Sequence, residues 1–334
     1  MAEIRALGQS SKGEALAPIS LAEPGELGAF EVDVDVVHCS VCHSDVHLVD
    51  GDWGDVARPL VPGHEIVGRV VGKGKKVELA DGAIVGIGWQ AGSCRACTPC
   101  RTEREHLCTG GKARTCMGRP GGFATRVRVD ARFAFELPKD LDAKDAAPLL
   151  CAGLTVFSPI ERLGIGAGMR VGVVGVGGLG HLAVRFAKAK GAEVIAFDPD
   201  PTKTELARAL GASELIDARG KLPARAVDAI LVPTHADLAW NDWMEVLDLE
   251  GTLCLVGIPS KPLALSPDPL LDGQKKITGS VIGSPAAMKR MLAFSAEHRI
   301  LPVVERMPMS AANEAIEKVR KGRARLRIVL DQDL

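Results

Sequence analysis

The chain contains no tyrosine among its 334 residues, and its aromatic content is limited to eight phenylalanines and four tryptophans. The missing phenol excludes every mechanism in which tyrosine acts as general acid or base, including that of the tyrosine-dependent carbonyl reductases. Chemistry at a carbonyl group would therefore need another group to handle the proton.

The sequence also lacks an excess of charge of either sign and any long apolar run. Its 41 basic and 42 acidic residues give a net charge of −1 and are scattered along the chain, so no basic face is expected to attract nucleic acid. No run of 18 apolar residues predicts a membrane-spanning helix, and residues 1–28 lack the pattern of a signal peptide. We expect a cytoplasmic protein without nucleic-acid or membrane partners.

Apolar residues and cysteines are present in quantity. Apolar residues make up 46% of the chain and charged residues 25%, which is the composition of an ordinary globular protein. Because single hydrophobic cores stop growing near about 250–300 residues, the length predicts two domains. In a reducing compartment, the nine cysteines indicate metal binding or catalysis rather than a disulfide framework.

The pattern of apolar residues changes near the middle of the chain. Up to about Val129, short β-branched runs broken by Gly, Pro and Asp predict an antiparallel β domain. Beyond Cys151, apolar runs alternate with amphipathic helical segments, which predicts a doubly wound parallel sheet and an α/β fold. Its strands are expected at 170–174, 194–197, 214–216, 229–232, 252–256 and 277–282. Two helices and a last strand at 326–330 follow, and periodicity leaves open which domain they join.

A glycine loop lies between the first of these strands and the helix after it. Residues 175–180 have the spacing G-x-G-x-x-G, which lets backbone N–H groups approach a pyrophosphate at the positive end of a helix. The spacing alone is a weak signal in a glycine-rich chain, but a strand before it and a helix after it are typical of a dinucleotide site. We expect cofactor contacts from Gly175, Gly177, Gly178, Leu179 and Gly180.

Asp198 ends the next strand, 18 residues after Gly180. A carboxylate at this position would bind the ribose hydroxyls of NAD and repel the 2′-phosphate of NADP. Lys203 could reach the same ribose. The alternative is a turn aspartate placed before Pro199. We expect NAD to be preferred over NADP.

Four cysteines lie within 15 residues of one another, at Cys94, Cys97, Cys100 and Cys108. Four thiolates can close a tetrahedral Zn²⁺ site that leaves no open position for substrate, so a structural zinc is expected here. A redox role is disfavoured because the C-x-x-C run lies in a loop rather than before a βαβ helix.

A second, dispersed set of cysteines and histidines could hold a catalytic metal. A catalytic zinc needs about three protein ligands and one open position. Spacing does not decide whether Cys39 or Cys42 is a ligand. The set comprises Cys39, Cys42, His43, His47, His64 and Cys151.

Several segments together resemble the zinc-dependent medium-chain alcohol dehydrogenases, and most closely the branch of cinnamyl alcohol dehydrogenases and bacterial broad-range aldehyde reductases. The matching segments are residues 42–45, 61–68, 148–155, 175–181 and 279–283, and the resemblance covers essentially the whole chain. It implies a GroES-like catalytic domain at residues 1–150, completed by residues 285–334. A Rossmann NAD-binding domain would occupy residues 151–284.

The same resemblance implies the zinc ligands. The catalytic zinc would be held by Cys42, His64 and Cys151, with Glu65 binding it transiently while water and substrate exchange. Cys39 would then be a packed thiol. The four clustered cysteines would hold the structural zinc, giving two zinc ions per chain.

The implied reaction is reversible hydride transfer between a primary alcohol and NAD. Zinc lowers the pKa of the alcohol, so that a zinc-bound alkoxide forms near neutral pH without a phenol. Ser44 would take the proton and pass it through the nicotinamide ribose to His47, which opens to solvent. Asp45 would fix the ring of His64. Further cofactor contacts would come from His43, Thr155, Val256 and Arg327.

Two tryptophans, Trp53 and Trp89, resemble the pocket walls of yeast-type enzymes, although either could equally pack in the β domain. As pocket walls they favour small to medium primary alcohols and aldehydes. The alternatives are an NADPH-preferring aldehyde reductase on the same scaffold and a non-catalytic zinc-stabilised binding protein. The family implies a homodimer or homotetramer. Ser40 departs from the glycine that is usual in the family.

Overall fold

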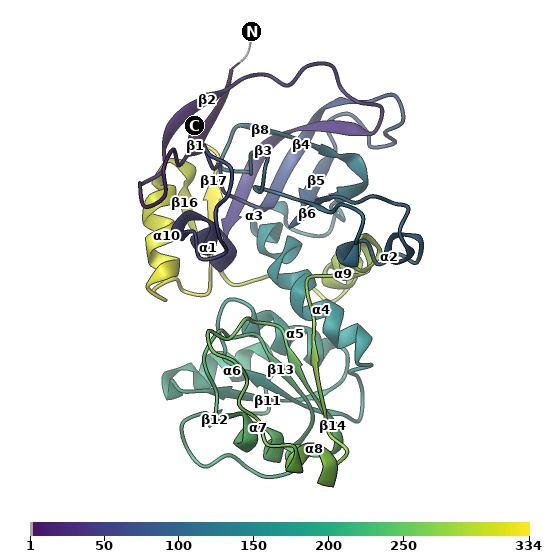
Figure 1. Ribbon diagram of the computed structural model, residues 1–334, viewed down its shortest axis with the longest axis vertical. Helices are drawn as coiled ribbons and strands as arrows, with labels where there is room; N and C mark the ends of the chain where they lie inside the picture. Colours follow the sequence, from purple (N-terminus) through teal and green to yellow (C-terminus); the bar gives the residue numbers. More distant parts are fainter. Residues whose placement is uncertain (1–2) are drawn as a thin grey trace. The chain divides into compact units, whose positions relative to one another are not determined.

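The computed structural model describes residues 3–334, which divide into two compact units. Unit 1 runs to Cys151 and resumes from Gly283 to Leu334, and unit 2 spans Ala152–Ile282. Each unit is built around its own β-sheet (Figure 1). Among the described residues, no helix combines the length and apolar character that crossing a membrane requires.

The main sheet of unit 1 has the strand order β16-β17-β3-β4-β5-β9, with β8 pairing to β3. All its pairs are antiparallel except β16 with β17. The predicted antiparallel β domain is therefore confirmed. The strands are β3 (Glu31–Val41), β4 (Glu65–Lys73), β5 (Ile84–Ile87), β8 (Arg126–Asp130), β9 (Ala134–Glu136), β16 (Val304–Pro308) and β17 (Arg327–Asp331).

Strand β3 shows why this part of the sequence forms a sheet. Its valines alternate with aspartates, so Val32 and Val34 point into the core and are fully buried, as expected for a strand with one face in the core. On the other face Asp33 accepts hydrogen bonds from Arg128 of β8, with Nε to Oδ1 at 2.7 Å. Cross-strand pairs of this kind fix the register of β3 against β8.

The last strand of the chain lies inside this same sheet, between β16 and β3. β17 pairs antiparallel with β3, bringing Val329 opposite Ser40. The C-terminal segment therefore joins the N-terminal sheet, which periodicity had left open. The remaining elements of unit 1 are β1 (Ile4–Gly8), β2 (Ala17–Leu21), β6 (Gln90–Gly92), β7 (Ala113–Arg114), α1 (His43–Asp50), α2 (Thr98–Arg101), α3 (Ala143–Ala146), α9 (Pro285–Glu297) and α10 (Ala312–Arg320).

Unit 2 contains a six-stranded sheet, parallel throughout, with the order β12-β11-β10-β13-β14-β15. The chain moves outward from β10 to one edge and then returns to build the other half, as in a doubly wound nucleotide-binding fold. The α/β prediction is confirmed. The strands are β10 (Arg170–Val174), β11 (Glu193–Asp198), β12 (Glu214–Asp217), β13 (Val227–Val232), β14 (Leu247–Leu255) and β15 (Lys276–Gly279).

Helices flank this sheet, and α5 shows how the sequence directs one to it. Its apolar stripe includes Leu182, Ala183, Phe186 and Ala187, which are all fully buried. The helix packs against α4 and against strands β10 and β11, as expected for an amphipathic helix on a sheet. The helices of unit 2 are α4 (Ala152–Arg162), α5 (Gly180–Ala189), α6 (Thr204–Leu210), α7 (Trp240–Val246) and α8 (Asp268–Asp272).

Candidate active site and zinc centres

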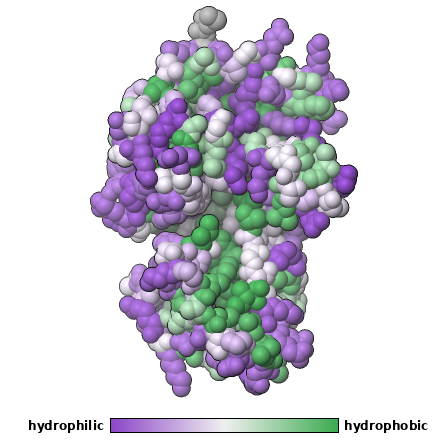
Figure 2. All heavy atoms as spheres, in the orientation of Figure 1, coloured by the Kyte–Doolittle hydropathy of each residue, from purple (hydrophilic) through white to green (hydrophobic). Residues whose placement is uncertain are grey.

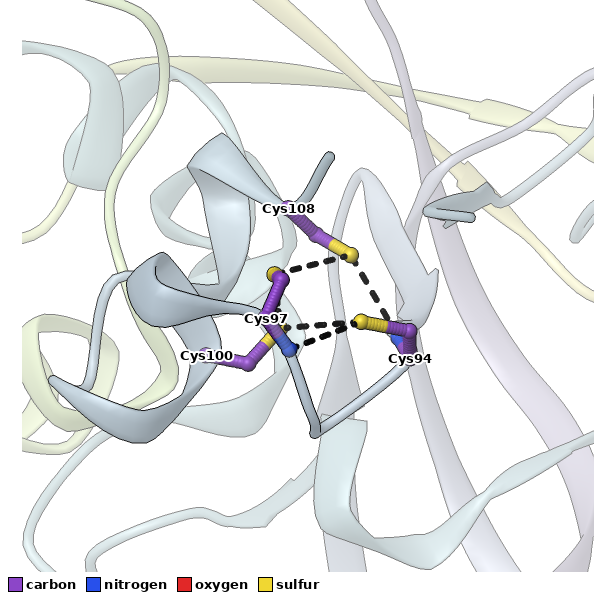
Figure 3. Close-up of side chains that lie close together, drawn as sticks. All are labelled: Cys94, Cys97, Cys100 and Cys108. Carbon is purple, nitrogen blue, oxygen red and sulfur yellow. Dashed lines mark hydrogen bonds between the residues drawn. The ribbon is translucent and has the colours of Figure 1, made fainter. Parts of the chain in front are cut away.

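The four clustered cysteines direct their sulfurs to one point (Figure 3). The Sγ–Sγ distances are 3.4 Å for Cys97 to Cys100, 3.8 Å for Cys97 to Cys108 and 3.9 Å for Cys94 to Cys100. A tetrahedron with Zn–S bonds of about 2.3 Å has S–S edges of about 3.8 Å. The residues present therefore fit a closed zinc site.

The local chain builds this site from two short helical turns. Cys97 is the N-cap of α2 and Cys100 lies inside it, while Cys108 ends a 3₁₀ turn at Glu105–Leu107. Backbone N–H groups aim at the sulfurs: Cys97 N lies 3.4 Å from Cys94 Sγ. Hydrogen bonds from the Cys100 and Thr109 backbone lower the pKa of Cys97 to about 5, which favours the thiolate that a metal needs.

A second group of donors converges in the core of unit 1. One donor atom each of Cys42, His64, Glu65 and Cys151 lies within 4.8 Å of the others, and the group is enclosed by the protein. Within residues 3–334, Cys39 is not part of this group. It is fully buried on β3, where burial raises the pKa of its thiol well above the usual range.

Asp45 holds two of these donors in place from the first turn of α1. Its Oδ2 accepts the backbone N–H of Cys42, the N-cap residue, at 2.9 Å. Its Oδ1 lies 3.0 Å from the Gly63 N–H and 3.0 Å from His64 Nδ1. Because a carboxylate only accepts, His64 carries its proton on Nδ1 and presents Nε2 as a lone-pair donor.

The donor set suits a zinc ion. His64 Nε2 is buried and has no hydrogen-bond partner, an arrangement that costs free energy unless another group satisfies it. A hydrogen bond from Cys151 outweighs burial and lowers the pKa of the Cys42 thiol well below its usual range. Two cysteines and one histidine with a carboxylate nearby leave an open fourth position, as in catalytic zinc sites.

Glu65 and Arg327 form a buried ion pair beside these donors, and Ser40 joins them. The guanidinium of Arg327 donates to the Glu65 carboxylate, and its Nη2 lies 3.3 Å from Ser40 Oγ. Burial raises the pKa of Glu65 to about 7 against the opposing effect of Arg327. Arg327, which was predicted to contact the cofactor, thus has its guanidinium engaged within unit 1, and its buried Nε atom has no partner.

The predicted relay and pocket residues lie along α1 and a neighbouring group of rings. Ser44 and His47 are three residues apart on α1, so they share one helix face. Trp53 stacks on His47, with ring centroids 5.0 Å apart. Trp89 meets the ring of His64 edge-on at 4.9 Å. The structure thus places Trp89 against a candidate zinc ligand.

Three side chains at this site had no role assigned from the sequence. Ser40 reaches Arg327, Asp52 lies 2.7 Å from His47 Nδ1, and Cys116 lies with Asp45 and His64 in one group of possible donors. Burial raises the pKa of Cys116 to about 11. Of these three, only Asp52 has a local signal in the sequence. Gly51 before it allows the turn that returns Asp52 to His47.

In unit 2, residues 175–180 connect β10 to α5. A side chain at Gly180 would come within 1.7 Å of the Gly175 carbonyl oxygen, so the glycine allows the helix to start against the strand. The first turn of α5 has no side-chain cap, and the N–H groups of His181 and Leu182 bond to the carbonyl oxygens of Gly177 and Leu179, each at 3.1 Å. The positive end of such a helix favours an anion.

Asp198 lies at the carboxyl end of β11 and is 2% exposed. Its carboxylate accepts the N–H of Val176 at 2.7 Å and that of Asp200 at 3.0 Å, and Lys203 Nζ lies 2.9 Å away. The acid thus joins the glycine loop to the next turn. Thr155 lies in α4, and Val256, which directly follows β14, bonds through its N–H to Val232 of β13 at 3.1 Å.

Comparison with known proteins matches two families. The family described as "Alcohol dehydrogenase GroES-like domain" matches residues 28–139, and the family described as "Zinc-binding dehydrogenase" matches residues 178–297. An aldehyde reductase of Synechocystis sp. is 40% identical over 92% of this chain and 93% of its own length.

Solved structures agree with the sequence matches. A cinnamyl alcohol dehydrogenase from Sorghum bicolor superposes with a TM-score of 0.93 and 33% identity, covering 99% of this chain and 98% of its own. A cinnamyl alcohol dehydrogenase from Helicobacter pylori, complexed with NADP(H), gives 0.91 and 30% identity, covering 98% of each chain. The cluster of four cysteines and the cluster around His64 both fit zinc. The chain belongs to the zinc-dependent medium-chain alcohol dehydrogenases, in the branch of cinnamyl alcohol dehydrogenases and aldehyde reductases, and it uses zinc and NAD(P).

Proposed function

We propose that this enzyme transfers hydride reversibly between small to medium primary alcohols, or their aldehydes, and NAD(H). The observation that carries the proposal is the convergence of Cys42, His64 and Cys151 around an unpartnered, buried His64 Nε2. In this proposal unit 1 is the catalytic domain and unit 2 binds the nucleotide.

The two zinc sites divide between chemistry and stability. Cys42, His64 and Cys151 hold the catalytic zinc, with Glu65 as a transient ligand, and the four clustered cysteines hold a structural zinc. When bound, the catalytic zinc supplies a Lewis acid that makes the alcohol more acidic, and NAD supplies the hydride acceptor. Asp45 fixes the tautomer and orientation of His64, as carboxylates behind metal-bound histidines do.

The proton leaves through Ser44 and then His47. Together these two side chains do what a phenol does in tyrosine-dependent enzymes. Ser44 receives the proton of the alcohol, and His47, one turn later on α1, releases it to water. His47 is suited to the exit because its side chain is 30% exposed and because an imidazole can both accept and release a proton.

The nucleotide site favours NAD. The carboxylate of Asp198 is held at the end of β11 by backbone N–H groups and by Lys203, where it would accept from ribose hydroxyls and repel a 2′-phosphate. His43, Thr155, Val256 and Arg327 complete the proposed cofactor contacts. The relative from Helicobacter pylori was solved with NADP(H).

Trp89 limits the substrate in this proposal, because its indole edge lies against the ring of His64. Replacing Trp89 by Ala removes that wall. We expect kcat/KM for six- to eight-carbon primary alcohols to rise at least about tenfold relative to ethanol, since even one additional methylene accommodated in an apolar pocket contributes roughly 1–3 kcal/mol. Initial rates with a series of primary alcohols measure the change. Phe30→Ala, at an exposed aromatic of the same unit, serves as control; an unchanged chain-length profile in W89A would contradict the placement.

We also propose that the enzyme is a homo-oligomer, a dimer or tetramer. In the described sheet of unit 2, β15 is an edge strand, and Ile258, Leu271 and Val281 are each more than half exposed. Figure 2 shows apolar residues gathered on a face of this unit. A second copy can pair with an edge strand about a two-fold axis. Light scattering should give the mass of two or four chains, and a monomeric mass would refute this.

A further inference from the structure

Ser40 belongs to a buried group of polar side chains beside the candidate catalytic zinc site. In the sheet of unit 1 it is paired with Glu65 of β4 on one side and with Val329 of β17 on the other. Ser40 and Glu65 are fully buried, and Arg327, at the start of β17, is 4% exposed. The hydroxyl of Ser40 therefore lies between the two strands that carry the ion pair.

This hydroxyl bonds to both members of the ion pair. Its Oγ accepts a hydrogen bond from Arg327 Nη2 at 3.3 Å, and the same nitrogen donates to Glu65 Oε2. Burial raises the pKa of Glu65 to about 7, and a hydrogen bond from the Ser40 hydroxyl is among the interactions that oppose this rise. A hydroxyl can accept one hydrogen bond while it donates another. The glycine that is usual in the family at this position can do neither.

The two oxygens of the Glu65 carboxylate have different surroundings. Oε2 is held by Arg327, whereas Oε1 is buried and has no hydrogen-bond partner within residues 3–334. One carboxylate oxygen also lies within 4.8 Å of the donor atoms of Cys42, His64 and Cys151. Since carboxylate oxygens are common zinc ligands, Glu65 can compete for a metal held by these three residues.

The fourth position of the site is thus open to two kinds of ligand. It can take the oxygen of water, alcohol or aldehyde, or it can take the Glu65 carboxylate, which would close the site to substrate. Hydrogen bonds from Arg327 and Ser40 oppose the second choice, because the carboxylate must weaken them to reach the metal. The Ser40 hydroxyl therefore affects how readily an outside ligand can bind.

We propose that Ser40 is a positioning residue of the catalytic zinc site, a role that rests on the zinc site proposed above. Its hydroxyl holds the Glu65 carboxylate against Arg327 and so keeps the fourth position open for substrate. Without the hydroxyl, Glu65 competes more strongly with outside ligands for that position.

The test measures ligand binding at the catalytic metal rather than turnover. Cobalt(II), which takes similar ligands and absorbs visible light, replaces zinc in the purified protein. Imidazole, which binds an open metal position, is titrated without nucleotide, and the change in absorption gives its Kd. We expect Ser40→Ala to raise this Kd about tenfold, the effect of losing one hydrogen bond to a charged group. Ser295→Ala removes another fully buried hydroxyl of unit 1 and should change the Kd less than about twofold.

A Glu65→Gln background shows whether the effect passes through Glu65. There Ser40→Ala should change the Kd less than about twofold, because a neutral amide competes poorly for the metal. A tenfold change in that background as well would overturn the role of Ser40. The same conclusion follows if Ser40→Ala matches Ser295→Ala when Glu65 is present, and this comparison decides alone if Glu65→Gln fails to fold.

Failure of the zinc site itself gives a different result. If the parent protein holds two cobalt ions per chain and its absorption does not respond to imidazole, the open catalytic site is wrong and the role of Ser40 falls with it. Ser40→Gly replaces Ser40→Ala if the latter fails to fold, and the same tenfold rise in Kd is expected.

Discussion

Cys42→Ala is expected to lower kcat/KM for alcohol oxidation by at least about a thousandfold and to leave one zinc per chain instead of two. The sulfur of Cys42 belongs to the buried donor group with His64 and Cys151, and a Lewis acid at such a site supplies several kcal/mol of transition-state stabilisation. The clustered cysteines at 94–108 are untouched, so the structural zinc should remain. Zinc analysis of the purified variant, together with initial rates, measures both effects.

Cys39→Ala is the matched control, because Cys39 lies only three residues earlier and is equally buried. It should keep both zinc ions and lose no more than a few-fold in rate, although the removed sulfur leaves a small cavity. The assignment of Cys42 as the ligand would be overturned if Cys39→Ala lost the metal while Cys42→Ala retained it.

The second large effect concerns the cofactor. Asp198→Ser is expected to shift the ratio of kcat/KM for NAD over NADP by at least about a hundredfold toward NADP. The variant would remove the hydrogen bonds that we propose to the ribose hydroxyls, and each bond to a charged group contributes about 1.5–3 kcal/mol. It also removes the repulsion of a 2′-phosphate and frees Lys203, now 2.9 Å from the carboxylate, to pair with that phosphate.

Asp217→Ser provides the comparison for this variant. Asp217 ends the neighbouring strand β12, directly opposite Asp198 in register, but its carboxylate is exposed and pairs with Arg219. Its removal should leave the cofactor ratio within about twofold. If the ratio of kcat/KM for NAD over NADP were the same in the wild type and in Asp198→Ser, the carboxylate would not select the nucleotide.

Local spacing in the sequence predicted the features that depend on neighbouring residues. The four cysteines at 94–108 could be assigned to one site because a short loop can bring them together whatever surrounds it, and their sulfurs do converge. The apolar stripe of α5 and the strands of unit 2 were likewise readable, since burial on a sheet imposes a fixed period.

Contacts that depend on tertiary structure were not predictable from spacing. Ser40 meets Arg327 only because β3 pairs with β17 from the other end of the chain. Cys116 lies near Asp45 and His64 because the segment around it folds onto Trp89, whose carbonyl accepts the Thr115 N–H at 2.9 Å. No periodic signal in the sequence reports such pairings.

The proposed mechanism accounts for catalysis in a chain without tyrosine. In the proposed mechanism a buried zinc site with an unpartnered histidine nitrogen makes a strong base unnecessary, and His47, which is half-buried and bonded to Asp52, gives the proton a way out. Phenols are therefore dispensable to the proposed chemistry.

The most direct test of zinc-dependent, NAD-linked hydride transfer is an initial-rate measurement on protein of known zinc content. Reduction of a short-chain aldehyde is followed with NADH and with NADPH, alongside oxidation of the matching primary alcohol. We expect two zinc ions per chain, activity in both directions and a higher kcat/KM with NADH. Two bound zinc ions with no turnover by either cofactor would contradict the catalytic role, and a higher kcat/KM with NADPH would contradict the cofactor assignment.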